Sequence, residues 1–174
     1  VYSRNGINAS LATPTFVKMF KEGDLRTERY FGDADEKNDG NYKIIKTYET
    51  SQYKCTFRTA ELYLNAAEAL AQLDQLPEAR DYLLMEKRYT SAGYTQKKNE
   101  VNAMNQAELI TEILNERARE LAFEGHRWFD LRRTTRPEQR KIIDGQTLIL
   151  SQDDERYTLR IPQSAIAANP DLMN

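Results

Sequence analysis

The sequence from 116 to 133 reads Glu-Arg-Ala-Arg-Glu-Leu-Ala-Phe-Glu-Gly-His-Arg-Trp-Phe-Asp-Leu-Arg-Arg, the densest mixture of charged and apolar side chains in the chain. From about residue 105 to about Gly125, apolar side chains recur at the i, i+3, i+4, i+7 spacing of an amphipathic helix. On the helical wheel, Arg117 and Glu124 fall inside the apolar arc, so we expect both to be partly buried. Because buried charges must be paired, the pattern predicts an ion network. Its expected members are Arg117, Glu120, Glu124, Arg127 and Asp130.

The segments that follow this helix are shorter. A second helical piece comes next, where we expect Trp128 to anchor an apolar cluster with Phe123 and Phe129. Further along, the strand-like segments Thr147–Leu150 and Tyr157–Ile161 are separated by acidic residues. They predict a β-hairpin near the C-terminus.

The segment before the densest stretch predicts a pair of helices. Residues 57–73 form a helical pattern whose polar side chains occupy one narrow sector, so its broad apolar surface must be covered on two sides. After a tight connection, Pro77 opens a second helix that reaches about Tyr89. Small side chains at Ala67 and Ala79 let the two helices approach closely. The hairpin therefore resembles one tetratricopeptide-type unit.

The remaining segments show weaker patterns. Residues 90–105 are polar and without periodicity, which predicts a loop. We expect the first 56 residues to be loop-rich, with a short helix from Pro14 to Lys21 capped by Thr13. Residues 42–53 are rich in Tyr, Ile and Thr, which favours a strand or a long loop.

These elements together predict a mainly α fold. It contains a tetratricopeptide-like helix hairpin, further helices, long loops and a small C-terminal β-hairpin. We expect a single region over residues 1–174. Within it, residues 1–56 are loop-rich, residues 57–133 form a helical core, and residues 134–174 form a loop, the β-hairpin and a tail.

Composition excludes several classes of function. The 174 residues are 40% hydrophobic with 7 Gly and 5 Pro, which is typical of a globular domain. The 25 Lys and Arg nearly balance the 27 Asp and Glu, so no basic field attracts nucleic acid. A single Cys and a single His exclude an intramolecular disulfide and a multi-histidine metal site, and we expect no metal and no cofactor. No apolar run of about 20 residues is present to span a membrane.

The glutamates of the densest stretch admit two interpretations. Glu116, Glu120 and Glu124 lie one helical turn apart, and two carboxylates about 5 Å apart are enough for a retaining glycoside hydrolase. Each glutamate, however, has an arginine at helical contact spacing, which would lower its pKa and spoil a general acid. Fixed ion pairs that tie helices together are the better account.

Four tyrosines in the loop-rich part are candidates for ligand binding. An exposed tyrosine can stack on a sugar face and donate a hydrogen bond, whereas packing of a strand is the alternative for each of them. The candidates are Tyr30, Tyr42, Tyr48 and Tyr53.

Several blocks of the sequence resemble the SusD/RagB family. They are residues 57–69 (Phe-Arg-Thr-Ala-Glu-Leu-Tyr-Leu-Asn-Ala-Ala-Glu-Ala), residues 116–133, and the pairs Ile161-Pro162 and Asn169-Pro170, in the family's order and spacing. Gly23-Asp24-Leu25-Arg26 in front of them also looks like a family feature. The resemblance covers only the C-terminal portion of such a protein.

The resemblance implies a surface-exposed outer-membrane lipoprotein of Bacteroidetes-type bacteria that captures glycans or other nutrients. Such a protein is not an enzyme and sits as a lid over a SusC-like TonB-dependent transporter. The lipid anchor of the family would lie in the part that this chain does not contain. Sugar contacts in the family come from variable loops, so the resemblance assigns no binding residue here.

Three hypotheses for function follow. The first is binding of a glycan and its delivery to a SusC-like transporter. The second is a tetratricopeptide-like scaffold that binds proteins and no sugar. The third is a hydrolase that uses the carboxylates between Glu116 and Glu124.

Overall fold

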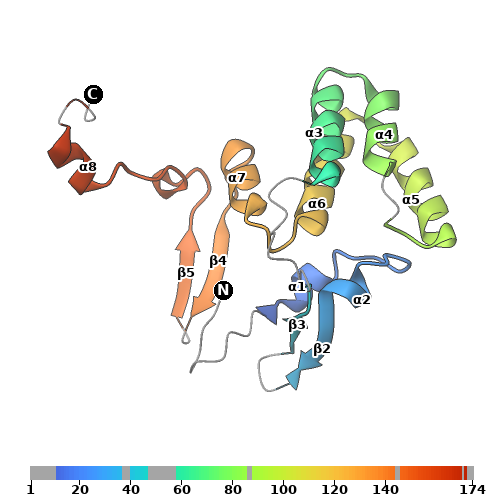
Figure 1. Cartoon of the computed structure of the whole chain (residues 1–174), viewed down its shortest axis with the longest axis horizontal. Helices are drawn as coiled ribbons and strands as arrows, with labels where there is room; N and C mark the ends of the chain where they lie inside the picture. Colours follow the sequence, from blue (N-terminus) through green and yellow to red (C-terminus); the bar gives the residue numbers. More distant parts are fainter. Residues whose placement is uncertain are drawn as a thin grey trace. The chain divides into compact units, whose positions relative to one another are not determined.

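The computed structural model describes residues 11–36, 40–46, 58–85, 88–143, 146–169 and 171. The chain forms two compact units, Val1–Leu121 and Ala122–Asn174. The described residues are mainly helical with short antiparallel strands, which confirms the predicted fold class (Figure 1). None of the helices in these residues combines the length and the apolar character needed to cross a membrane.

The centre of the first unit is the predicted helix hairpin. Helix α3 (Thr59–Gln72) packs against α4 (Leu76–Leu84), and α6 (Gln106–Glu120) packs against α3. Ala67 and Ala79 are completely buried, as close approach of two helices requires. Small and branched apolar side chains fill the space between the helices. The buried cluster is Leu64, Ala67, Ala71, Ala79, Leu83, Val101, Leu109 and Ile113.

Residues 91–103 form a helix, so the prediction of a loop over residues 90–105 is wrong. Helix α5 (Ser91–Ala103) begins at Thr90, whose side chain accepts a hydrogen bond from the backbone N–H of Gly93. Val101 is its only fully buried apolar side chain among the described residues. A helix with so little apolar surface shows no stripe in the sequence.

Helix α6 is shorter than expected. A capping box between Asn105 and Glu108 fixes its start, and it ends at Glu120 instead of about Gly125. Residues 121–125 form turns in which Phe123 has a φ of +67° and Gly125 a φ of +87°. Glu124 therefore lies beyond the end of the helix, where positions on the helical wheel have no meaning.

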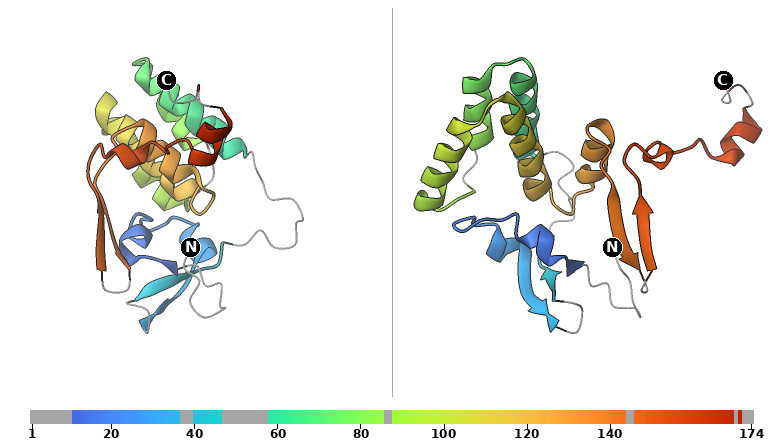
Figure 2. Two further views of the ribbon diagram at one scale, coloured as in Figure 1. Left: turned by 90° about the vertical axis from the view of Figure 1, so that its left-hand side faces the viewer. Right: turned by 180° about the vertical axis from the view of Figure 1, so that it is seen from behind.

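The described residues of the N-terminal part, 11–36 and 40–46, contain a small sheet and two short helices. Three strands, β1 (Leu11–Ala12), β2 (Phe31–Asp35) and β3 (Asn41–Ile44), form an antiparallel sheet in the order β1-β3-β2 (Figures 1 and 2). Two short helices, α1 (Pro14–Val17) and α2 (Thr27–Tyr30), accompany the sheet.

Local signals and aromatic packing hold this part together. Helix α1 begins after Thr13, which caps it as predicted, and ends before Lys21. Edge-to-face contacts join neighbouring aromatic rings, with centroids 5.0 to 6.3 Å apart. These rings belong to Phe16, Phe20, Tyr30 and Phe31.

The turn before α2 docks against the segment between α4 and α5. The backbone N–H of Leu25 donates to the carbonyl of Arg88 at 2.9 Å, and that of Thr90 donates to the carbonyl of Gly23 at 2.8 Å. A Cβ on Gly23 would lie 2.9 Å from Thr90 Oγ1, and a Cβ on Gly93 would lie 3.1 Å from the Gly23 carbonyl oxygen. Glycine at both positions allows the two backbones to touch.

Replacing Gly23 by alanine tests this close approach. Gly23 has a φ of +82°, so Gly23→Ala introduces both backbone strain and a clash with Thr90. We expect a loss of about 2–3 kcal/mol in the free energy of unfolding, measured by urea denaturation. Gly40 is the matched control, because it has a φ of +69° and no atom within 4 Å of a built Cβ. Gly40→Ala should cost about 1 kcal/mol, and equal losses at the two positions would contradict the close approach.

The second unit contains helix α7 (His126–Arg133), the strands β4 (Gln139–Ile143) and β5 (Gln146–Leu150), a 3₁₀ turn η2 (Glu155–Tyr157) and helix α8 (Gln163–Ala168) (Figure 2). A C-terminal β-hairpin exists as predicted, but the prediction of its partner strand is wrong. Strand β5 pairs with β4, whereas the expected second strand, Tyr157–Ile161, begins in the 3₁₀ turn.

Trp128 packs on a different partner from the ones expected. Its ring stacks on that of Tyr157, with centroids 5.0 Å apart and an interplanar angle of 8°. Tyr157 is completely buried, and its hydroxyl donates to the carbonyl of Pro137. Phe123 and Phe129 are 48% and 62% exposed, so they do not form a buried cluster. The stacked rings of Trp128 and Tyr157 therefore form the apolar contact that was expected between Trp128, Phe123 and Phe129.

Candidate functional site

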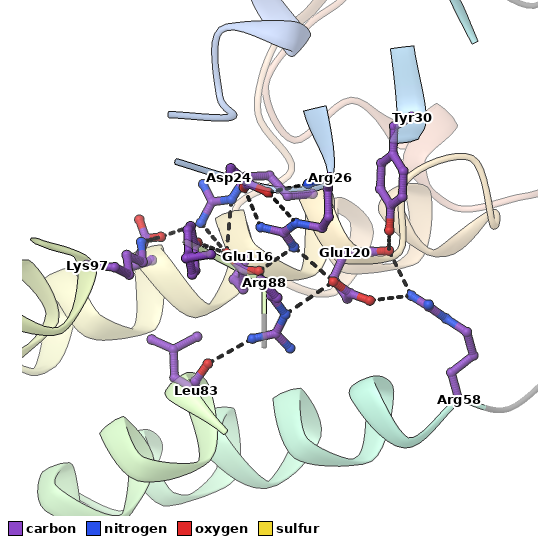
Figure 3. Close-up of polar contacts among 12 residues, drawn as sticks. Asp24, Arg26, Tyr30, Arg58, Leu83, Arg88, Lys97, Glu116 and Glu120 are labelled. Carbon is purple, nitrogen blue, oxygen red and sulfur yellow. Dashed lines mark hydrogen bonds and ion pairs between the residues drawn. The ribbon is translucent and has the colours of Figure 1, made fainter. Parts of the chain in front are cut away.

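A network of buried charges lies on one face of α6, within the first unit (Figure 3). Glu116 is at its centre, with a side chain only 1% exposed. Its Oε1 accepts a hydrogen bond from Arg26 Nη1 at 2.5 Å, and its Oε2 accepts from Arg119 Nη2 at 2.6 Å. The Tyr89 hydroxyl also donates to Oε2 at 3.2 Å, and Arg88 Nε lies 3.2 Å from Oε1. Both carboxylate oxygens are fully engaged.

Arg26 brings the N-terminal part of the chain into this network. Its guanidinium donates twice to Asp24, from Nε at 2.9 Å and from Nη2 at 2.7 Å. Its Nη1 bridges Glu116 and Glu120, with a distance of 2.9 Å to Glu120 Oε2. The docking of the Gly23 turn places Arg26 at α6. One side chain thus links the sheet region to the helices.

Glu120 is the last residue of α6, and it accepts hydrogen bonds both at its carboxylate and at its backbone carbonyl. Its carboxylate accepts from Arg58 Nη2 at 2.7 Å and from Arg88 Nε at 3.2 Å. Its backbone carbonyl accepts from the Tyr30 hydroxyl at 3.3 Å, from Lys46 Nζ at 3.0 Å and from Arg58 Nη2 at 2.8 Å. Cations at a helix C-terminus complement the negative end of the helix dipole. Tyr30, Lys46 and Arg58 thereby cap the C-terminus of α6.

The network continues along α6 toward α5. Glu112 accepts hydrogen bonds from Lys97 of α5 and from Arg119. Lys97 is 7% exposed and Arg119 is 6% exposed, so these cations are paired in the interior. The network therefore holds α5 as well as the N-terminal part against α6.

This environment removes the two central glutamates from acid–base chemistry. Burial alone would raise the pKa of Glu116, but the charges of Arg26, Arg119 and Arg88 outweigh it and hold the pKa well below its usual range. The pKa of Glu120 is also lowered, because Arg88, Arg26 and Arg58 outweigh its burial. A general acid must be protonated near neutral pH. Glu116 and Glu120 are instead permanent anions that hold arginines.

The lowered pKa values predict that acid destabilises the fold. In the unfolded chain these carboxylates titrate near 4.5, whereas in the folded chain they bind protons only at lower pH. The unfolded state therefore binds more protons in this range, so the stabilisation is complete above about pH 4.5 and is lost as the pH falls below it. Urea denaturation between about pH 3 and pH 7 measures this. A free energy of unfolding that stays constant over that range would contradict the buried network.

The structure places the predicted network residues in different surroundings. Glu120 lies in the network described above. Arg117 is buried and donates a hydrogen bond to Asn65 of α3. The other three predicted members belong to the second unit, where Asp130 is 3% exposed and accepts from Arg133 Nη2 at 2.7 Å.

Most of the partners that hold the network together were not predicted from the sequence. They are Asp24, Arg26, Arg58, Arg88, Lys97 and Glu112, whereas ion pairing of Glu116 with an arginine one helical turn away was expected and is made by Arg119. Glu116 and Arg119 lie outside the apolar arc of the wheel, and Arg26 comes from far away in the sequence. The one available signal was Gly23-Asp24-Leu25-Arg26, to which the sequence alone assigned no role.

The four candidate tyrosines fall into three groups. Tyr30 is 8% exposed and packs against Phe20 and Phe31, so it offers no open ring face and its role as an exposed platform is corrected. Tyr42 lies half-buried in β3. Tyr48 and Tyr53 lie outside the described residues, and their role stays a prediction. Among the described residues, no three His, Cys, Asp or Glu side chains gather as metal ligands.

The fold of this chain is similar to that of a protein of known structure. No curated protein matches the chain. The crystal structure of a SusD-like carbohydrate binding protein from Bacteroides vulgatus ATCC 8482 matches with 23% sequence identity and a TM-score of 0.58. The match covers 91% of this chain and 40% of that protein, so the chain spans less than half of the length of this relative. At this identity the likeness shows a shared fold.

The amino-acid sequence also matches a known protein family. A sequence model described as the SusD family matches residues 35–174, which include the helix hairpin, α6 and the whole second unit. The stretch at 116–133 lies inside this range, and the resemblance inferred from it is confirmed. With most of its length matched by the family's own sequence pattern, the chain belongs to the SusD family.

Proposed function

We propose that this chain is part of a protein that binds glycans at the outer surface of the cell and delivers them to a SusC-like TonB-dependent transporter. The observation that carries this proposal is membership of the SusD family over residues 35–174. The solved relative from Bacteroides vulgatus, which is named as a carbohydrate binding protein, supports it. The protein would act at the outer membrane.

The geometry of the ion network favours binding over hydrolysis. A hydrolase needs one carboxyl group that can donate a proton and one that can attack or activate water. Glu116 and Glu120 each contact at least two arginines, and both keep lowered pKa values. We infer that the chain is not an enzyme and that these glutamates serve the fold.

Titration calorimetry against oligosaccharides from plant and host glycans tests the proposal. We expect saturable binding of at least one neutral oligosaccharide, with the sugar recovered intact by chromatography. The candidate contacts are Tyr42, Tyr48 and Tyr53, so alanine at each of them should weaken binding. Release of shorter sugars would contradict a binding protein, and absence of binding to every oligosaccharide would contradict glycan binding by this part of the protein.

A protein scaffold is the second candidate, and one observation favours it. Leu62 of α3 and Leu73, the residue that caps its C-terminus, are 64% and 70% exposed, and they lie on one face because eleven residues make about three helical turns. An exposed apolar face of this kind is typical of a surface that another protein covers. If the scaffold hypothesis holds, Leu62→Glu with Leu73→Glu abolishes capture of a protein partner. The glycan hypothesis expects oligosaccharide binding to survive the same double substitution.

A further inference from the structure

A shallow depression lies in the first unit, beside the ion network. Its lining includes Lys21 and Glu22 from the turn before Gly23, Tyr89 from the segment before α5, and Gln96 and Glu100 from α5. It encloses about 320 Å³ with open solvent at its mouth included, of which about 20 Å³ can hold the centre of a water molecule. At about 10–15 Å³ for each water, the depression has room for one small polar group in contact with its walls. A larger ligand would lie across the mouth.

The rim of the depression is held in place by Glu100. Its carboxylate accepts a hydrogen bond from Lys21 Nζ at 2.9 Å and another from Gln96 Nε2 at 3.2 Å. The hydrogen bond from Lys21 lowers the pKa of Glu100 and keeps it an anion. Side chains from two separate segments therefore meet at the rim in the absence of a ligand.

The rim keeps both donors and acceptors open. Within the described residues, Gln96 uses one amide proton on Glu100, which leaves its carbonyl oxygen and its second proton. Lys21 keeps two of its three protons, and Glu22 has no ion-pair or hydrogen-bond partner within these residues. A sugar hydroxyl donates one hydrogen bond and accepts others. Neighbouring donors and acceptors at one rim are the complement of such a group.

The charges in the depression favour a neutral ligand over an anion. Lys21 is paired with Glu100, and the two buried cations of the lining, Lys97 and Arg119, are both paired with Glu112. An anion would have to compete with an existing carboxylate for each of these cations. A neutral hydroxyl group needs no such exchange.

We propose that this depression is a subsite for one residue of a neutral glycan, with one hydroxyl or hydroxymethyl group in the space that admits a water-sized group. The proposal rests on the proposed function and adds a location to it. The sugar ring lies across the mouth, where the Gln96 amide and the Lys21 ammonium reach its hydroxyl groups. Tyr89 lines the same depression and gives it one aromatic side chain.

Nuclear magnetic resonance of the ¹⁵N-labelled chain tests the subsite. The probe is the neutral oligosaccharide that binds most tightly in calorimetry. We expect it to shift the side-chain amide signals of Gln96 and the backbone amide signal of Gly93, which lines the same depression. Gln96→Ala should raise the dissociation constant about three- to tenfold, the usual effect of losing a neutral hydrogen bond. Inorganic phosphate should leave these signals unchanged.

The control is Asn102→Ala, which removes an exposed amide from the same helix outside the depression. Its dissociation constant should equal that of the unmodified chain, and circular dichroism should show both variants folded. Tight binding with unshifted Gln96 signals and an unchanged Gln96→Ala constant would overturn the subsite and leave glycan binding intact. Shifts caused by phosphate alone would also overturn it. Absence of binding to every oligosaccharide would contradict both proposals together.

Discussion

Glu116→Gln should lower the free energy of unfolding by about 3–5 kcal/mol, because it removes the charge that several buried arginines share. Gln is nearly the same size as Glu, so the loss reflects charge and hydrogen bonding more than a cavity. Arg26 and Arg119 would stay buried with their strongest partner neutralised. Urea denaturation followed by circular dichroism measures the change.

Glu78→Gln is the matched control for this substitution. Glu78 lies on α4, is exposed, and takes part in no ion pair or hydrogen bond among the described residues. Its replacement should change the free energy of unfolding by less than about 0.5 kcal/mol. A similarly small effect at Glu116 would mean that solvent already screens the arginines, and the network would lose its stabilising role.

Leu64→Ala should destabilise the chain by about 2–5 kcal/mol, because it opens a cavity between α3 and its neighbours. Leu64 is completely buried in the cluster that joins α3, α4, α5 and α6. The surrounding side chains come from four helices and cannot all move into the space. Thermal and urea denaturation both report the loss.

Leu62 gives the control within the same helix. It has the same side chain two residues earlier but is 64% exposed, so Leu62→Ala should cost less than about 1 kcal/mol. The contrast between the two leucines tests whether α3 faces the core as described. Equal losses would show that the face carrying Leu62 is covered as well.

The parts of the fold that depend on neighbouring residues could be predicted from the sequence. The helix hairpin follows from the local spacing of residues such as Leu64 and Ala67, and the start of α1 follows from Thr13. Helix α5 was missed because only Val101 and Lys97 are buried along it, which leaves no apolar stripe to detect. The partner of β5 was also missed, although Asp144-Gly145 in the sequence is a strong signal for a two-residue hairpin turn.

The network could be predicted only in part, because a helical wheel describes one helix at a time. The wheel placed Arg117 and Glu124 on the buried side of the helix; Arg117 is buried, but Glu124 lies beyond the end of α6. It could not show that the side carrying Glu116 is covered by Arg26 and Arg88, which arrive from other parts of the chain. Long-range contacts of this kind leave no local pattern in the sequence.

The separation of Arg26 from its partners also bears on how the protein folds during synthesis. Arg26 and Glu116 are 90 residues apart, and Arg26 and Glu120 are 94 residues apart. The ribosome therefore releases Arg26 well before either glutamate exists, and the guanidinium stays in water until α6 has been made. Contacts with such separation form late, because the loop between them must close first. The helix hairpin can assemble early, and the N-terminal sheet is secured only when the last turn of α6 leaves the exit tunnel.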